Sequence, residues 1–393
     1  MTGSKTGIHV VFFIPNSNTY VDRIKTLKAA AELVGKITVL VGVDDCLEKI
    51  ENSDVFFMKS VGFKPGDRFG NILKASRQVA SLNDVDVIHD TFGNLMITFI
   101  TQRLKDDRPV LLSSFYALDR WRINHVWKNQ GYKTKDLIFT KSGLRMYLGA
   151  LSQYFMARLS DFVILQAEGL VEPYTESVGM ANSSVKVITN SVDTNYWTPL
   201  PKRVNNDCKD ILKLVFVGGL DDSHGLFPIL KVLHRLIGEN YKIKMNVITK
   251  PGIGEIARVE EFIKNHSLQS HVIMETGLSR EQMRDRYRSA DCLIYQTIND
   301  GSPRVVAEAL SCGVSVIASK HPGIEVLDDG KEFIKFTLFS DEIAIANEIK
   351  QFINKPDLLK ISSVLGRNRM IDKFHIDVVG KEYACLYKTI VNN

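Results

Sequence analysis

Short apolar runs rich in β-branched residues alternate with amphipathic segments along most of the chain. This alternation predicts βα units arranged around parallel sheets. Runs that are apolar on both faces, such as Leu214–Val217, need helices on both sides of the sheet. We therefore expect an α/β fold of doubly wound, parallel-sheet domains that bind ligands at the carboxyl ends of their strands.

The strand pattern recurs in both halves of the chain, and a length of 393 residues favours two domains. The polar stretch 199–210 suggests the boundary. We predict an N-terminal domain over 1–192, a C-terminal domain over 193–375, and a C-terminal helix over 376–393 that returns to the N-terminal domain. The expected strands are Ile8–Ile14, Ile37–Val41, Val55–Met58, Val85–His89, Val110–Ser113, Phe162–Leu165, Val185–Ile188, Leu212–Val217, Lys244–Thr249, Val272–Glu275, Cys292–Tyr295 and Val314–Ala318.

Composition excludes several classes of protein. No apolar run approaches the ~18–20 residues that a membrane-spanning helix needs. The first residues do not resemble a secretory signal, so we expect a cytoplasmic location. The five cysteines are scattered without a C-x-x-C pair, which argues against a disulfide framework and a structural metal. A net charge of +5 without a recognition motif argues against nucleic acid as a partner.

The segment 292–318 carries the strongest chemical signal. A buried strand is expected to end near Tyr295, and the loop after it holds Asp300 and Gly301. Ser302 and Pro303 then suit the N-cap and first turn of a helix. That helix should run to Gly313, a glycine suited to a left-handed C-terminal cap.

The start of this predicted helix favours an anionic ligand. Backbone N–H groups and the positive end of the helix dipole at Pro303–Val305 can bind an anion, and Arg304 can add a fixed charge. Gly301 lets a ligand approach the backbone closely. Asp300 and Glu308 can flank that ligand and accept hydrogen bonds from hydroxyl groups. An anion joined to a polyol describes a nucleotide sugar.

Here the chain resembles the family-4 retaining glycosyltransferases of the GT-B fold, also called glycosyl transferases group 1. Their signature is an acid, seven residues and a Glu, which Asp300 and Glu308 match with Asp where Glu is commoner. Four further segments are similar in order: 187–193, 216–220, 288–291 and 322–325. The resemblance implies two Rossmann-like domains facing a central cleft.

The same resemblance implies roles for individual residues. Asp300 would act on the donor sugar as the catalytic candidate, and Glu308 would bind the ribose. The remaining donor-binding candidates are Gly301, Ser302, Pro303, Arg304, Val305, Gly218, Gly219, His224, Gly225 and Lys250. No metal or cofactor is expected, because helix dipoles and cations can stabilise the leaving diphosphate.

The function implied is transfer of a hexosyl group, with retention, from a nucleotide diphosphate sugar to a saccharide or lipid-linked saccharide. UDP-sugars are favoured over GDP-sugars as donors, and the pathway expected is synthesis of cell-surface polysaccharide or glycolipid. Two alternatives stay open. One is a catalytically silent GT-B binding or partner subunit, and the other is a nucleotide-sugar epimerase.

The chain departs from the family pattern where two cations usually bind the diphosphate. Gly219 stands at the usual Arg position, beside Gly218, and His224 stands at the usual Lys position, beside Gly225. Histidine is mostly neutral at pH 7. The diphosphate charge would then be met by helix N-termini, by Arg304 or by Lys250. These losses fit the hypothesis of a silent subunit.

Candidates for the acceptor lie in the first half. The first βα turn, Pro15–Thr19, contains no glycine, but Asn16 and Asn18 can cap a helix and bind a ligand. His89 and Asp90 end a strand and could assist the acceptor, with a structural strand-end pair as the alternative.

A basic and aromatic stretch spans Thr101–Ser160. It contains 11 Lys and Arg against 4 Asp and Glu, interleaved with aromatic residues. Two interpretations stay open, and the first is a surface for anionic lipid, which would place the protein peripherally on the inner face of the membrane. The alternative is a solvated charged face over ordinary core aromatics.

Overall fold

The computed structural model describes residues 7–45, 50–91, 93–115, 141–200, 211–250, 255–298 and 300–392. Its contacts divide the chain into two compact units. The first unit consists of Met1–Ser191 together with Phe374–Asn393, and the second is Val192–Lys373. The π-helical turn Met370–Phe374 leads from the second unit back to the first.

The described part of the first unit contains a seven-stranded parallel sheet of order β3-β2-β1-β4-β5-β6-β7. Its strands are β1 (Ile8–Asn16), β2 (Gly35–Val43), β3 (Phe56–Ser60), β4 (Val87–Thr91), β5 (Val110–Ser114), β6 (Phe162–Leu165) and β7 (Val185–Val187). The helices are α1 (Val21–Val34), α2 (Arg68–Ala80), α3 (Met96–Arg103), α6 (Lys141–Leu159), α7 (Val171–Val178) and α15 (Ile376–Asn392), with 3-10 turns at Asn18–Tyr20, Glu168–Leu170 and Asn182–Ser184.

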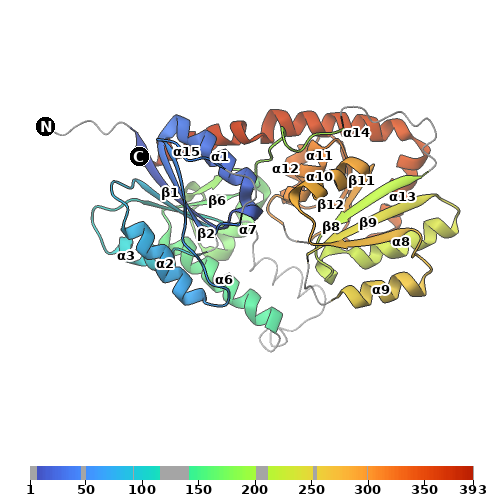
Figure 1. Cartoon of the computed structure of the whole chain (residues 1–393), viewed down its shortest axis with the longest axis horizontal. Coiled ribbons are helices and arrows are strands. Elements are labelled where there is room, and N and C mark those ends of the chain that lie inside the picture. Colours follow the sequence, from blue (N-terminus) through green and yellow to red (C-terminus); the bar gives the residue numbers. More distant parts are fainter. Residues whose placement is uncertain are drawn as a thin grey trace. The chain divides into compact units, whose positions relative to one another are not determined.

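The C-terminal helix α15 belongs to the first unit, where it lies along α1 (Figure 1). Both helices cover one face of the sheet, and their buried side chains join a single apolar cluster with β1 and β2. Phe12 and Phe13 are both fully buried although they point to opposite faces. A strand buried on both faces is what its uninterrupted apolar sequence predicts.

The described part of the second unit contains a six-stranded parallel sheet of order β10-β9-β8-β11-β12-β13. Its strands are β8 (Leu212–Val217), β9 (Ile243–Thr249), β10 (Val272–Thr276), β11 (Cys292–Tyr295), β12 (Ser315–Ser319) and β13 (Ile334–Thr337). The helices are α8 (Leu226–Gly238), α9 (Ile256–Asn265), α10 (Arg280–Ser289), α11 (Arg304–Ser311), α12 (Pro322–Asp328), α13 (Glu342–Asn354) and α14 (Pro356–Arg369), with a 3-10 turn at Asp222–His224. Buried side chains of α8 and α13 join the main apolar cluster of this unit.

The predicted fold class, two doubly wound parallel-sheet domains, is confirmed. Each of the twelve expected strands is present, with ends that move by a few residues. The edge strand β13 was not predicted, because it has four residues and its two central side chains are only half-buried. Among the described residues, no helix is long and apolar enough to cross a membrane.

One local prediction is wrong. The helix after Asp300 begins at Arg304, so its N-cap is Pro303 and not Ser302. Pro303 has an extended backbone with φ −69° and ψ 116°. The N–H of Ser302 donates instead to Asp300 Oδ1 at 3.3 Å, which holds Ser302 in the loop. The predicted left-handed cap at Gly313 is confirmed by its φ of 73°.

Candidate functional site

The strand order of the second unit reverses between β8 and β11, so the connections that follow these two strands leave on opposite faces of the sheet. Their loops nevertheless pack against one another. A Cβ added to Gly225 would lie 2.8 Å from the Cβ of Gln296, and one added to Gly323 would lie 2.1 Å from the carbonyl oxygen of Asp300. Loops after β8, β11 and β12 therefore meet at one edge of the sheet, at the point where doubly wound domains bind ligands.

Asp300 lies in the loop after β11 and is held at both carboxylate oxygens. The Tyr295 hydroxyl donates to Oδ2 at 2.8 Å, and the Ser302 N–H donates to Oδ1 at 3.3 Å. Desolvation raises the pKa of Asp300, while the Tyr295 and Ser302 bonds and the positive charge of Arg304 act in the opposite direction. The residue as a whole is half-buried, and its carboxylate is fixed by these two bonds.

Glu308 lies on α11 and is half-buried. The hydroxyl of Tyr287, on α10, donates to its Oε2 at 3.2 Å. Tyr287 is fully buried, and its ring packs edge-on against Trp197 with 5.8 Å between centroids. Burial, and then the Glu308 charge, raise the pKa of Tyr287, so its hydroxyl stays a donor at neutral pH. Each acid of the motif thus contacts one buried tyrosine.

The loop after β8 is organised around His224. Its Nδ1 lies 3.1 Å from Ser223 Oγ and 3.3 Å from Asp221 Oδ1. The bond to His224 is the main cause of a lowered pKa at Asp221, so that acid is ionised. A Cβ added to Gly219 would lie 2.9 Å from two atoms of the His224 ring. The ring therefore occupies the space that a side chain at position 219 would need.

The other predicted donor residues of the second unit vary in position. Gly301, Ser302 and Pro303 are buried in the loop before α11, while Arg304 and Val305 are half-buried in its first turn. The charges of Arg304 and His224 both lower the pKa of Asp300. The Gly218 N–H is used in the sheet, where it donates to Ile248 O at 3.1 Å. Lys250 is exposed just after β9.

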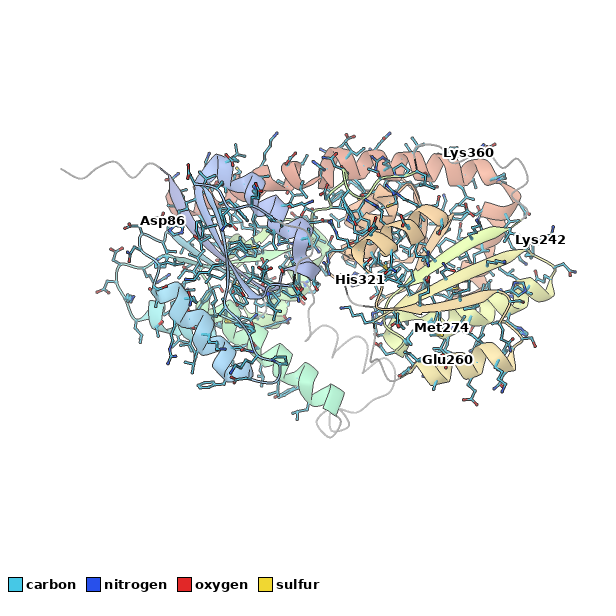
Figure 2. The ribbon with its side chains drawn as sticks, in the orientation of Figure 1. Asp86, Lys242, Glu260, Met274, His321 and Lys360 are labelled. Atoms are coloured by element: carbon cyan, nitrogen blue, oxygen red, sulfur yellow. The ribbon has the colours of Figure 1, made fainter. Side chains whose placement is uncertain are left out.

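His321 is a further polar group at this edge of the sheet. It caps α12, where Nδ1 accepts the N–H of Gly323 at 3.1 Å, and Figure 2 labels it. Burial lowers the pKa of His321 to about 4, so the ring is neutral at pH 7. Among the residues that the structure describes, no three His, Cys, Asp or Glu side chains gather closely enough to hold a metal ion.

In the first unit, Asn16 lies just at the end of β1. Its Nδ2 donates to Asp45 Oδ2 at 2.7 Å, and its Oδ1 accepts the N–H of Thr19 at 2.8 Å. The N-cap of the 3-10 turn Asn18–Tyr20 is Ser17 and not Asn16. The side chain of Asn18 lies outside the described residues. The role of Asn16 toward an acceptor stays a prediction.

His89 and Asp90 end β4 and point to opposite faces of the sheet. His89 Nδ1 lies 2.8 Å from the Tyr387 hydroxyl of α15, and Nε2 lies 2.7 Å from Ser114 Oγ. Burial lowers the pKa of this ring. Asp90 is also buried, accepts the Leu95 N–H at Oδ1 at 3.1 Å, and has its pKa raised to about 8 by desolvation. Both residues are built into the core of the first unit.

The expected lipid surface falls partly outside the described residues, because 116–140 are not described. The described part includes α6, which exposes an apolar row at helical spacing. Its members are Leu144, Tyr147, Leu148, Leu151 and Phe155.

With this geometry in place, comparison with known proteins identifies the second unit. Residues 202–369 match the family model Glycosyl transferases group 1. The chain carries a glycosyl transferases group 1 domain. Asp300, Glu308, Gly219 and His224 all lie within the matched residues.

The domain has curated relatives of low identity. The chain is 28% identical over 144 residues to the "Phosphatidylinositol N-acetylglucosaminyltransferase gpi3 subunit" of Schizosaccharomyces pombe, covering 36% of this chain and 30% of that protein. It is 21% identical over 183 residues to the "D-inositol 3-phosphate glycosyltransferase" of Corynebacterium jeikeium, covering 44% of each. The chain thus spans less than half the length of each of these relatives.

Solved structures match the whole chain. A sucrose-phosphate synthase from Thermosynechococcus elongatus superposes with a TM-score of 0.76 at 15% identity, covering 98% of this chain and 99% of that one. The Anabaena Alr3699/HepE structure in complex with UDP and glucose gives 0.72 at 14% identity, covering 97% and 99%. Both structures are similar to this chain in fold. The fold of this chain is therefore GT-B.

Three contact residues of the domain were missed from the sequence: Tyr287, Tyr295 and Asp221. Tyr295 is the last residue of a buried strand, five positions before the acid that it contacts. A polar group at the carboxyl end of a central strand was the available signal for it. Tyr287 precedes Glu308 by 21 positions, and no local spacing connects them.

Proposed function

We propose that this protein is a family-4 retaining glycosyltransferase that moves a hexosyl group from a nucleotide diphosphate sugar, a UDP-sugar rather than a GDP-sugar, without a metal ion. One observation carries the proposal. Asp300 and Glu308, the two acids of the family signature, lie in the loop before α11 and on α11 itself, and each accepts a bond from a buried tyrosine. Hydroxyl groups of the donor sugar and of its ribose match these acceptors.

The proposal assigns the diphosphate to the start of α11. The first N–H groups of a helix have no partner within the helix and carry its positive partial charge. Preorganised donors of this kind stabilise the negative charge that grows on a leaving diphosphate. Arg304 adds a guanidinium at the first helical position, and His224 a second group near Asp300. The acceptor hydroxyl would be deprotonated by a phosphate oxygen of the donor.

We further propose that the first unit binds a saccharide or lipid-linked saccharide, in synthesis of cell-surface polysaccharide or glycolipid. Support comes from the exposed apolar row on α6 and from the excess of basic residues over 101–160. One curated relative is named a phosphatidylinositol N-acetylglucosaminyltransferase subunit, and phosphatidylinositol is a lipid. The location proposed is the cytoplasm, with peripheral binding to the inner face of the membrane.

A second candidate is a catalytically silent subunit that binds a nucleotide sugar or a partner. The observation that favours it is the His224 ring packed over Gly219, where the resembled family has two permanent cations. A site with fewer fixed charges would bind the diphosphate less tightly and stabilise less of its charge in the transition state.

Calorimetric titration with UDP-, GDP- and ADP-sugars tests these proposals. Wild type should bind at least one donor, and Asp300→Ala and Glu308→Ala should weaken that binding. The matched control is Glu281→Ala, because Glu281 is an exposed acid on α10 of the same unit. No binding by wild type refutes the proposed function. Binding followed by sugar transfer or hydrolysis refutes the silent subunit, and binding without either refutes the enzyme.

Sedimentation with lipid vesicles tests the membrane proposal. Wild type should sediment with anionic phosphatidylserine vesicles, less so as salt increases, because surface charges are screened over about 10 Å at 0.1 M salt. Leu148→Ser and Phe155→Ser, on the exposed row, should reduce this fraction. Equal binding to neutral and anionic vesicles, or none, contradicts the proposal.

A further inference from the structure

Tyr295 is the last residue of β11, a strand with a neighbour on each side. It pairs in register with Ala318 of β12 and is 5% exposed, so the sheet and its surroundings fix the ring. From that fixed position its hydroxyl donates to Asp300 Oδ2 at 2.8 Å. A rigid strand thus sets the place of a side chain that belongs to a loop.

Groups from several elements act on Asp300. Arg304 of α11 and His224 of the loop after β8, itself paired with Asp221, lower the pKa of Asp300 through their charge. The N-terminus of α12, capped by the neutral His321, contacts the backbone at Asp300 and Gly301. Among these neighbours it is Tyr295, buried and uncharged, whose side chain bonds the carboxylate at normal hydrogen-bond distance.

The two bonds to Asp300 leave it able to bind a ligand. A carboxylate offers about four acceptor positions on its two oxygens. Tyr295 and the Ser302 N–H occupy one on each oxygen. The side chain is therefore held in one orientation, and two of its four acceptor positions are taken by these bonds. A group fixed before the ligand arrives loses little further freedom when the ligand binds.

Asp300 also has a shorter side chain than the Glu that is commoner at this position in the resembled family. A shorter acid reaches less far from its backbone, and its place in the loop must be correspondingly well defined. A tyrosine at the end of the preceding strand, whose hydroxyl donates to Oδ2, holds the carboxylate in that place.

We propose that Tyr295 is a positioning residue, whose hydroxyl holds the Asp300 carboxylate in the orientation that receives a hydroxyl group of the donor sugar. The inference rests on the proposed function. A merely structural Tyr295 would fill the core beside β12 and affect stability alone. The two roles differ in what removal of the hydroxyl does to Asp300.

The test compares wild type, Tyr295→Phe, Asp300→Asn and the double variant. Tyr295→Phe keeps the ring and its volume and removes only the hydroxyl. UDP release from UDP-glucose and from UDP-N-acetylglucosamine is followed from pH 5 to 9. We expect kcat of Tyr295→Phe to fall about tenfold, since bonds to charged groups are the strong ones. The donor KM should change less than twofold, because Glu308 and the start of α11 are untouched.

The pH profile supplies a second readout. The Tyr295 bond lowers the pKa of Asp300, so loss of the hydroxyl raises that pKa. The acidic limb of the rate profile should therefore move to higher pH in Tyr295→Phe. In the Asp300→Asn background, Tyr295→Phe should change kcat no further. Tyr174→Phe is the matched control for loss of a buried hydroxyl, because the Tyr174 hydroxyl is buried and bonds no other residue in the described part of the chain.

The outcomes separate the inference from the proposed function. If wild type turns over a donor, and Tyr295→Phe keeps the wild-type kcat and acidic limb, the inference fails while the proposed function stands. An equal effect of Tyr295→Phe with and without Asp300 also overturns it, because the hydroxyl would then act elsewhere. If wild type neither binds nor hydrolyses any donor, both fail. Thermal unfolding of all four proteins shows whether a lower kcat results only from a smaller fraction of folded protein.

Discussion

Replacing Asp90 with Asn should abolish a large pH dependence of stability in the first unit. Asp90 is 1% exposed at the end of β4, and its Oδ1 accepts the N–H of Leu95 at 3.1 Å. Oδ2 is buried and has no hydrogen-bond partner among the described residues. Desolvation raises the pKa of this carboxyl from 3.8 to about 8, against backbone hydrogen bonds that lower it. The folded protein therefore holds Asp90 in its neutral acid form at pH 7.

The magnitude follows from proton linkage. Below about pH 4 the acid is protonated in both folded and unfolded chains, and its contribution is fully present. Between about pH 4 and pH 8 the unfolded chain releases the proton and the folded chain keeps it, so the free energy of unfolding falls as pH rises. At 1.36 kcal/mol for each unit of pKa difference, the loss is about 5 kcal/mol at pH 8 and reaches an upper value of about 6 kcal/mol above it.

Asn keeps the acceptor oxygen for the Leu95 N–H and has no charge to desolvate. Urea unfolding at pH 5, 7 and 9 should give a higher midpoint for Asp90→Asn than for wild type, with the smallest difference at pH 5 and the largest at pH 9. Asp86→Asn is the control, because Asp86 accepts the His9 N–H in the same unit and is only half-buried. A midpoint difference that stays constant from pH 5 to 9 would show that the Asp90 carboxyl is not neutral in the folded protein.

Three further substitutions test other contacts. Glu308→Gln should weaken donor binding about tenfold, because a neutral amide accepts ribose hydroxyls less strongly, and calorimetry measures this. Gly323→Ala should destabilise the second unit by about 1–3 kcal/mol and weaken donor binding, since its Cβ would collide with the Asp300 backbone. Its control is Gly238→Ala, which has open space around the added Cβ and should be neutral or stabilising in thermal unfolding. Burial raises the pKa of Asp161, but hydrogen bonds from the Arg108 side chain and the Leu111 N–H outweigh burial and lower it. The stability that this carboxylate contributes at neutral pH is therefore lost as pH falls through the lowered pKa. Asp161→Asn should remove this acid dependence in unfolding experiments below pH 5.

The sequence determined the strands of both sheets because apolar runs buried on two faces cannot be mistaken for surface segments. Leu214–Val217 is such a run, and β8 lies where it was expected. Strand β13 escaped because an edge strand is half exposed and keeps only part of that pattern. The start of α11 was misplaced by one residue because Asp300, and not the sequence Ser-Pro alone, decides how Ser302 is held.

The candidate site was less accessible to sequence. Asp300 and Glu308 were found because they repeat a family spacing, whereas the tyrosines that hold them follow from tertiary packing. The face of a side chain also mattered: His89 and Asp90 are adjacent in sequence, yet one contacts α15 and the other starts the connection to α3. A sequence pattern that marks polar residues near a strand end does not show which face of the sheet each side chain points to. That requires the position of each residue within β4.

Gly219 and His224 stand where the resembled family has two cations, and the contact between these two residues gives a last prediction. A side chain at position 219 would meet the His224 ring at 2.9 Å. Gly219→Arg alone should therefore displace the ring and weaken donor binding, although it adds a positive charge. His224→Lys replaces the ring with a flexible chain, so the double variant should bind UDP-sugars more tightly than wild type in calorimetric titration. Tighter binding by Gly219→Arg alone would show that the ring does not restrict position 219, and that the two departures from the family pattern are independent.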